Sequence, residues 1–409
     1  MQFATYEKRT IIIENIKVKN HYESSLRHQL DLALTNTNIV IFTVVSLFLP
    51  YILTGIVLAF MAIYVIINKQ TRQLIFVHKG SDFLKMFFAF VLIVPFIYQN
   101  WIGFIVGVGM ILGLVLGLFM RSIMTRELYE KVLTLVCALS LTCAGYAIIE
   151  KLFHILSNTN TNSRISTVFS HPNYFGTVVG TVIIICAYKV LTNQGKQWFF
   201  YMVAFFNIIS MYLCKSMFVW VEVFLGISVL LIVLKKHRLL AVWLSTAALG
   251  IFVILFLDVN LIPRLSDVDV TVKLRMQIWD LAIRQIKAEP LFGHGFLSFS
   301  YLYDASYQNQ MIPHSHSLYI DTLLNFGIVG TVMFLGYFIK YYLSVFKACF
   351  KKKQTLITSL ILAVTVATLV HGAADLTIFW IQTLPLFLFI MAGLGAVEKS
   401  DEDSTVLSK

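Results

Sequence analysis

The chain has 409 residues, of which 58% are hydrophobic and only 13% are charged, and its mean hydropathy is +0.80. This composition excludes an ordinary soluble domain and predicts a polytopic membrane protein. The net charge of +11 would suggest nucleic-acid binding in a soluble protein. Here, however, the basic residues cluster in short connections beside apolar runs, as the positive-inside rule describes. We therefore expect the lipid bilayer, and no nucleic acid, as a partner.

Apolar runs follow a polar N-terminal segment, residues 1–34, that lacks the features of a signal peptide. The runs predict an all-α membrane protein with about twelve transmembrane helices, at residues 35–49, 51–67, 83–98, 101–120, 132–155, 174–192, 198–213, 217–234, 239–257, 317–343, 355–372 and 377–397. The first two runs also fit one long helix kinked at Pro50. Charge bias favours two crossings, because the basic connections then all lie on the cytoplasmic side.

The expected organisation is a cytoplasmic segment 1–34, transmembrane helices 1–9 over 35–257, and a large extracytoplasmic catalytic loop over 258–316. Helices 10–12 follow over 317–397, and the tail 398–409 is expected in the cytoplasm, like the N-terminus. Within the loop, the segment Val272–Lys287 predicts an amphipathic helix at the outer interface, ended by Pro290 and Gly293. Its apolar residues are spaced for one helical face: Val272, Met276, Trp279, Ile283 and Ile286.

The densest polar cluster lies where this loop returns to the membrane, at Gly293-His294-Gly295-Phe296 and around His314 and His316. A histidine near its free pKa can take a proton from a sugar hydroxyl at neutral pH, so this cluster is the candidate active site. The two histidines could instead cap a helix together with neighbouring serines, or hold a metal. A metal is disfavoured because no third histidine or cysteine is nearby apart from His294.

Ionisable groups inside apolar runs are costly and need a partner or water. Lys215 and Glu222 are seven residues apart and are expected on one face of a helix, and His371 and Asp375 are four residues apart. Each pair is open to three readings: a proton relay in a transporter, a substrate contact, or an interhelical clamp. We find no glycine loop for a nucleotide and no acidic metal motif, so no cofactor is expected.

Arginine offers paired donors to two phosphate oxygens, so the arginines of the predicted external loops are candidate phosphate ligands. Arg275 is one helical turn before Trp279, where a lipid headgroup would lie, although a charge reaching out from a surface helix explains it equally well. Arg164 lies near the run Phe169-Ser170-His171-Pro172-Asn173 on the other external loop. A loop with a Pro-Asn turn is the simpler interpretation of that run.

Taken together, the motifs resemble the O-antigen ligase and polysaccharide polymerase family of bacterial membrane glycosyltransferases. The resemblance rests on four pieces, in order: Phe169 to Asn173, Arg275 through Trp279 leading to Pro290–Phe296, His316 to Ile320, and Asn325 to Gly330. The chain departs from the family pattern at Ser317 and Asn325, where Asn and Glu are usual. Lys215, after Cys214, stands where the family commonly has arginine after serine.

The resemblance implies transfer of an undecaprenyl-diphosphate-linked oligosaccharide to an acceptor hydroxyl, with inversion and without a metal, at the outer face of the bacterial cytoplasmic membrane. It implies His316 as the general base, and Arg275 and Lys215 as the residues that hold the diphosphate. The other residues that it points to are Arg164 and Arg264 as further phosphate ligands, and His314, Asn173 and Tyr319 as residues that shape the pocket.

Within this family we favour a polymerase of repeat units for a surface polysaccharide such as a capsule, working with a flippase and a chain-length regulator. A ligase that transfers finished glycan to a lipid, a protein or a wall polymer uses the same donor. From another class, a flippase or ion-coupled transporter would depend on Glu222 or Asp375 and tolerate His316→Ala. A non-catalytic scaffold for export would tolerate all three changes.

Overall fold

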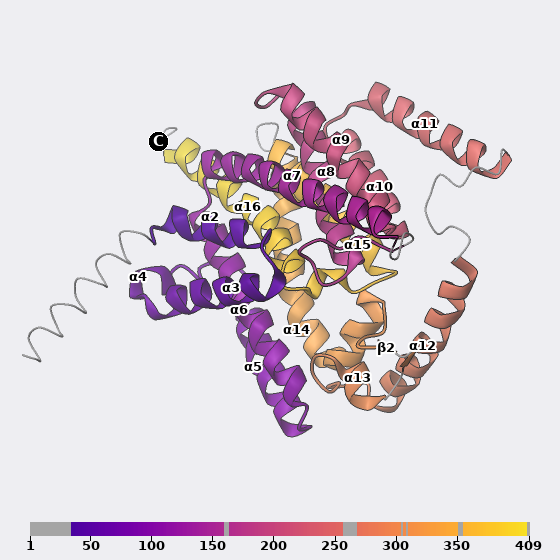
Figure 1. The fold of residues 1–409 in the computed structure, drawn as a ribbon. Coiled ribbons are helices and arrows are strands. Elements are labelled where there is room, and N and C mark those ends of the chain that lie inside the picture. Colours follow the sequence, from indigo (N-terminus) through magenta and orange to yellow (C-terminus); the bar gives the residue numbers. More distant parts are fainter. Residues whose placement is uncertain are drawn as a thin grey trace, which may run out of the picture. The chain divides into compact units, whose positions relative to one another are not determined.

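The computed structural model describes residues 34–158, 163–256, 268–303, 306–307, 310–350 and 355–406 (Figure 1). The chain divides into two units, Met1–Phe42 and Thr43–Lys409. The described residues of the first unit are 34–42, which include the start of α2. The elements from α3 to α16 all belong to the second unit, which holds the candidate site.

The described residues are almost entirely helical, as predicted. The first half contains α2 (Asn36–Ser46), α3 (Tyr51–Ile67), α4 (Lys69–Arg72), α5 (Ser81–Ile97), α6 (Trp101–Ile123), α7 (Arg126–Leu156), α8 (Pro172–Leu191) and α9 (Gln197–Cys214). The second half contains α10 (Met217–Val233), α11 (His237–Phe256), α12 (Val268–Ala288), α13 (Ser298–Leu302), α14 (Leu318–Cys349), α15 (Thr355–Gly372), η2 (Thr377–Phe379) and α16 (Thr383–Val406). One antiparallel hairpin joins β1 (Ser306–Tyr307) to β2 (Gln310–Met311), with Ser306 opposite Met311.

Each of the twelve apolar runs coincides with a helix, which confirms a polytopic membrane protein. Among the described residues, eight helices are long and apolar enough to cross a membrane: α6, α7, α8, α9, α11, α14, α15 and α16. The helices α2, α3 and α10 are apolar but shorter, and the number of crossings stays a prediction. The stretch around Pro50 is broken rather than kinked, because α2 ends at Ser46 and α3 begins at Tyr51.

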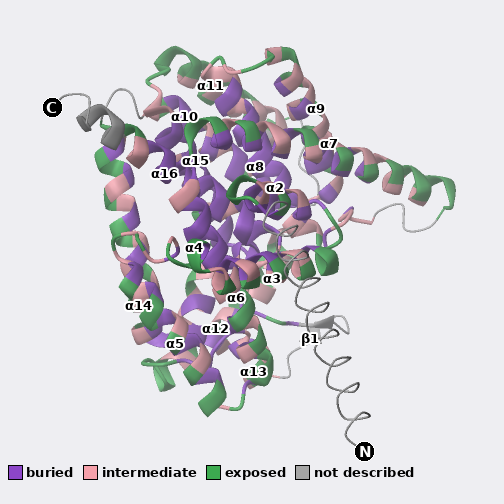
Figure 2. Cartoon of the chain, turned by 90° about the vertical axis from the view of Figure 1, so that its left-hand side faces the viewer, coloured by how far each residue is buried: buried purple, intermediate pink, exposed green. Residues whose placement is uncertain are grey.

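Burial is greatest in α8, α15 and α16, which lie inside the bundle (Figure 2). No side chain is buried in the apolar window of α11, and α11 packs mainly on α10, where Trp243 stacks on Phe224. A helix whose exposed side chains are apolar is suited to contact lipid. The bundle therefore has a conventional buried centre and an apolar outer surface.

Polar contacts join the connections in two groups, at opposite ends of the helices. At one end, Asn100 donates to the carbonyl oxygens of His294 and Phe296 at 3.0 and 2.9 Å. At the other end, Arg121 at the end of α6 pairs with Glu398 at 2.7 Å. The first group contains the segments that the sequence places outside, and the second contains segments that it places in the cytoplasm.

The helix predicted at Val272–Lys287 is present as α12, and it ends at Ala288, two residues before Pro290. This helix also has a face packed on protein, which the sequence did not predict. Ile278 and Ala282 form the buried centre, in a cluster with Phe299, Ile312 and Leu324. Val272, Met276 and Ile283 are exposed, while Trp279 and Ile286 pack at the edge of the cluster. The packed face is set by the segment 296–312 and by α14, which helical periodicity in α12 does not reveal.

The segment Pro290–Phe296 lies against a break in α14. At Gly327 the backbone has φ 57° and ψ −167°, which interrupts the helix. The amides of Ile328 and Val329 are thereby freed to donate to the carbonyls of Pro290 and Leu291, at 2.8 and 3.0 Å. These two hydrogen bonds hold the start of the segment Pro290–Phe296 against α14. The sequence predicts that this segment belongs to the external loop.

We expect Gly327→Ala to destabilise the protein by roughly 1–3 kcal/mol, because the left-handed backbone is strained for any residue with a side chain. A Cβ atom there would also lie 2.3 Å from the carbonyl carbon of Leu291. Thermal denaturation of the purified protein in detergent measures the effect. The matched control is Gly145→Ala in α7, where a Cβ atom meets nothing within 4 Å. Equal loss of stability in both variants would contradict the strain at Gly327.

Candidate active site

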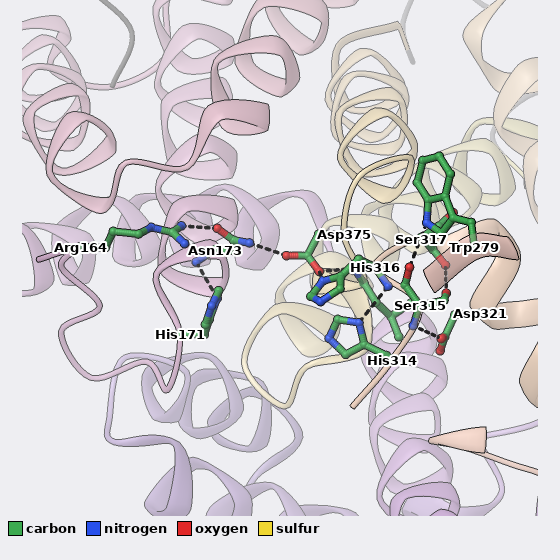
Figure 3. Close-up of polar contacts among 11 residues, drawn as sticks. Arg164, His171, Asn173, Trp279, His314, Ser315, His316, Ser317, Asp321 and Asp375 are labelled. Atoms are coloured by element: carbon green, nitrogen blue, oxygen red, sulfur yellow. Dashed lines mark hydrogen bonds and ion pairs between the residues drawn. The ribbon is translucent and has the colours of Figure 1, made fainter. Parts of the chain in front are cut away.

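The two histidines lie in a tight loop, residues 313–317, immediately before α14 (Figure 3). Trp279 of α12 donates from Nε1 to the carbonyl oxygen of Ser315 at 2.9 Å, and the Ser315 amide donates to Asp321 Oδ1 at 2.8 Å. Ser317 is the N-cap of α14 and accepts from the amide of Ile320. Both sides of the loop are therefore held, one by α12 and the other by the first turn of α14.

His316 has a backbone φ of 51°, in the left-handed region. This conformation costs a non-glycine residue roughly 1–2 kcal/mol, so it persists only where surrounding contacts hold it. The His316 amide donates to His314 Nδ1 at 3.2 Å, and the two rings are 4.5 Å apart. The fold thus directs the His316 side chain toward a partner that is distant in sequence.

That partner is Asp375, in the connection after α15. His316 Nδ1 lies 3.1 Å from Asp375 Oδ1, and the Leu376 amide donates to the same oxygen at 2.8 Å. The other carboxylate oxygen accepts from the side-chain amide of Asn173, at the start of α8. Asp375 is 4% exposed, so these donors compensate a carboxylate that has lost most of its water.

Arg164 completes the chain of contacts shown in Figure 3. Its guanidinium donates from Nη2 to the Asn173 side-chain oxygen, and from Nε to the carbonyl of Cys214 at 3.1 Å. Arg164, Asn173, Asp375 and His316 therefore form one network across three connections of the chain, those before α8, before α14 and after α15. Four of the residues predicted for the site, counting His314, are brought together by tertiary structure.

Electrostatics assign the protonation of this network. Burial would raise the pKa of Asp375, but the His316 hydrogen bond and the neighbouring histidines hold it well below its usual range. Burial, followed by the charge of His316, lowers the pKa of His314. An ionised Asp375 can only accept, so we assign the proton of His316 to Nδ1. The lone pair then lies on Nε2, as a general base requires.

A metal could also use these groups. His314, His316 and Asp375 each offer a ligand atom, and those atoms lie within 4.8 Å of one another. Asp375 supplies the third ligand whose absence argued against a metal in the sequence. The expectation that no metal takes part therefore stays a prediction, and it can be tested directly.

The remaining predicted site residues are the proposed phosphate ligands Lys215, Arg275 and Arg264, and Tyr319. Lys215 is the C-cap of α9, with φ 50°, next to the Cys214 carbonyl that Arg164 contacts. The Arg275 guanidinium lies 5.7 Å from the centre of the Phe218 ring, in the first turn of α10. Tyr319 donates from its hydroxyl to the Leu369 carbonyl of α15 at 2.8 Å. Arg264 lies outside the described residues.

The pairing of the buried ionisable groups differs from the sequence-based interpretation. Lys215 and Glu222 do not share a helix, because the chain turns at Lys215 and α10 begins at Met217. Glu222 instead pairs with His371 at 2.7 Å, and both are almost fully buried between α10 and α15. Asp375, assigned to His371 by spacing, contacts His316.

Asp375 is therefore the residue whose role sequence reasoning missed. It is 59 positions from His316, and no local motif connects them. The available signal was an acidic residue at the end of an apolar run, where an uncompensated charge is costly. That signal indicates that a partner exists but does not identify it.

Two cavities of about 520 Å³ lie in the bundle. One opens beside His314 and extends between α3, α6 and α16. The other lies among α8, α9, α10 and α11, and its lining includes Met211, one helical turn before Lys215. The lining of the second cavity is entirely nonpolar or aromatic. Both cavities have the size of ordinary small-molecule sites.

Residues 180–335 match a family model described as O-antigen ligase. The resemblance to the O-antigen ligase and polymerase family is thereby confirmed. The matched segment contains Lys215, Arg275, His314 and His316, whereas Asn173 and Asp375 lie on either side of it. A search of curated proteins found no match. The family match implies a membrane glycosyltransferase-like enzyme, either a polymerase or a ligase.

Acidic pH should destabilise the fold through His171, the N-cap of α8. Burial, followed by the charge of Arg164, lowers the pKa of His171 from 6.5 to about 4. Between these values the unfolded chain binds a proton that the folded chain does not, so stability is lost as the pH falls from 6.5 toward 4. We expect His171→Asn, which keeps a good N-cap, to flatten this dependence. Melting temperatures in detergent across that range measure it, and an unchanged slope would contradict the assignment.

Proposed function

We propose that this protein is a polymerase of undecaprenyl-diphosphate-linked oligosaccharide repeat units. It would act at the outer face of the bacterial cytoplasmic membrane, with both termini in the cytoplasm. The observation that carries the proposal is the hydrogen bond between His316 and a buried Asp375, within a network that joins three connections of the chain. A histidine oriented by a carboxylate is suited to general-base catalysis.

In the proposed step, His316 Nε2 takes the proton from the acceptor hydroxyl. The hydroxyl oxygen attacks the anomeric carbon of the donor from the face opposite the leaving group. The bond between that carbon and the diphosphate oxygen breaks, and the diphosphate leaves with the electron pair. Configuration at carbon inverts, and the reaction needs no other reactant. Asp375 stabilises the imidazolium that forms.

Charge develops on the diphosphate in the transition state, so cations belong near it. Lys215 is adjacent in sequence to Cys214, which contacts the network through Arg164. Arg275 is one turn from Trp279, the residue bonded to the histidine loop. We assign the diphosphate to Lys215 and Arg275. Arg164 donates to Asn173 and to the Cys214 carbonyl, which favours a positioning role for it.

The donor also carries a long apolar chain, which needs an apolar surface inside or beside the protein. The cavity among α8 to α11 has such a lining, and it begins one turn from Lys215. We assign the undecaprenyl chain of the donor to this cavity. A flippase that delivers the donor and a chain-length regulator are the protein partners that a polymerase would require.

A ligase would use the same donor and the same base, with a different acceptor. A transporter is favoured by one observation, the buried Glu222–His371 pair, because such pairs can carry protons through a membrane. The pair also fits an interhelical clamp between α10 and α15. An Asp375 variant would impair both a transferase and a transporter, because Asp375 is the partner of His316. A Glu222 variant can distinguish the two classes.

We expect His316→Ala and Asp375→Asn to accumulate single lipid-linked repeat units in cells, because the acceptor hydroxyl loses its base. Loss of an oriented general base should slow transfer by about 10²- to 10⁴-fold. Electrophoresis of lipid-linked glycans at matched protein level provides the measurement. Asp280→Asn is the control, since Asp280 is exposed and, among the described residues, its ion pair is with Arg284 of the same helix.

Other profiles would exclude the polymerase. Full-length lipid-linked chains in His316→Ala would indicate a ligase. A normal profile in His316→Ala, together with loss of surface glycan in Glu222→Gln, would indicate a transporter. A normal profile of lipid-linked glycans in all of these variants would indicate a non-catalytic scaffold for export.

The proposed transfer uses protein groups for both the base and the phosphate, so we expect it to proceed without a metal. Purified protein treated with EDTA should keep its full transfer rate in vitro, and added Mg²⁺, Mn²⁺ or Zn²⁺ should not raise it. If activity disappeared with the chelator and returned with one ion, His314, His316 and Asp375 would be its ligands, and the metal-free step would be wrong.

A further inference from the structure

An aromatic wall stands beside the histidine loop, formed by Tyr51, Tyr174 and Trp380. Tyr174 and Trp380 are stacked, with ring centres 4.5 Å apart and planes inclined by 8°. Tyr51 lies 5.8 Å from Trp380 at an angle of 48°. The three residues come from the start of α3, the first turn of α8 and the residue after η2. None of them takes part in the proposed chemistry.

All three rings line the cavity that opens at His314. Tyr174 directly follows Asn173, the residue bonded to Asp375. One residue of the wall, Tyr174, is therefore adjacent in sequence to the network that orients the proposed base. None of the three rings is fully buried, and Tyr51 is 39% exposed. A molecule in the cavity would contact the aromatic wall and the histidine loop together.

The composition of this cavity excludes a diphosphate. No lysine or arginine occurs among its described lining residues, and its one carboxylate, Asp321, is engaged by Ser315 and Asn325. A diphosphate needs cationic donors, which lie at Lys215 and Arg275 instead. This cavity is suited to a neutral ligand.

The polar and apolar parts of the lining indicate what kind of neutral ligand. The faces of sugar rings carry C–H groups that pack on flat aromatic surfaces, and their edges carry hydroxyls. Among the described residues, the Tyr174 hydroxyl has no hydrogen-bond partner, so it is available to a sugar hydroxyl. Farther from His314 the lining is apolar, with Leu58, Ile105, Met110 and Leu384. The part of the lining beside His314 therefore suits a neutral sugar, which the three rings and the Tyr174 hydroxyl can contact.

We infer that the wall of Tyr51, Tyr174 and Trp380 is the subsite for the terminal sugar of the acceptor, that this sugar is neutral, and that the acceptor's own lipid diphosphate lies outside this cavity. This inference rests on the proposed function in treating His316 as the base that receives the acceptor proton. It places acceptor and donor on opposite sides of the Asn173–Asp375–His316 network. The hydroxyl to be activated then approaches His316 from the wall, and the donor diphosphate approaches from Lys215.

The kinetic test compares Trp380→Ala with Trp380→Phe in nanodiscs, with donor and acceptor concentrations varied separately. Loss of one stacking ring should raise the KM for the acceptor about tenfold. The donor KM and kcat should stay near wild type. The acceptor KM of Trp380→Phe should lie between those of wild type and Trp380→Ala. Trp198→Phe, at an exposed tryptophan of α9, is the control. A change in the donor KM instead of the acceptor KM would overturn the inference.

A binding test that needs no transfer uses the His316→Ala protein in phosphatidylcholine nanodiscs. A soluble bromophenyl glucoside is compared with bromobenzyl alcohol, since bromine quenches nearby tryptophans. We expect stronger quenching by the glucoside, and its loss in His316→Ala/Tyr174→Ala, which keeps Trp380 as the reporting tryptophan. Equal quenching by both compounds would overturn the sugar subsite. Selective quenching in a protein whose wild type transfers no sugar would support the subsite and refute the proposed function.

Discussion

A carboxylate buried in an apolar bundle must be compensated, and the arrangement of the candidate site follows from how Asp375 meets this constraint. Its oxygens accept from His316, from the Asn173 side chain and from the Leu376 amide. These donors come from the start of α8, the loop before α14 and the connection after α15. Three parts of the chain that are far apart in sequence are therefore held around one charge.

The same constraint explains the further contacts of the network. Asn173 can direct its amide at Asp375 because Arg164 occupies its side-chain oxygen. His316 can adopt a strained backbone because its loop is fixed by Trp279 on one side and by Asp321 on the other. Each polar group in this series makes a hydrogen bond with the next. Asp375 engages Nδ1 of His316, so Nε2 is the nitrogen that we propose as the base. One end of the network contacts the Cys214 carbonyl, next to Lys215, and the other end lies beside His314, which lines a cavity without cations among its described lining residues.

Sequence periodicity predicted the helices well, because an apolar run of bilayer length has few alternatives to a helix. It did less well with faces and partners. In α12 the spacing predicted an interfacial face with Val272, Met276 and Ile283, but it did not predict the face packed on protein, with Ile278 and Ala282. At Lys215 the spacing to Glu222 suggested a shared helix, but a left-handed residue ends α9 there. Tertiary contacts decide the first point and a single backbone turn decides the second, and a local pattern shows neither.

The sequence by itself determined the membrane class and the positions of the helices, and it singled out the histidines as the candidate base, because hydropathy and residue chemistry are local properties. Only the tertiary structure decided that Asp375 is hydrogen-bonded to His316 and that Glu222 is hydrogen-bonded to His371. It also decided that Tyr51, Tyr174 and Trp380 form one wall. Such pairings depend on which helices pack together, and residues 59 or 149 positions apart carry no local sign of each other.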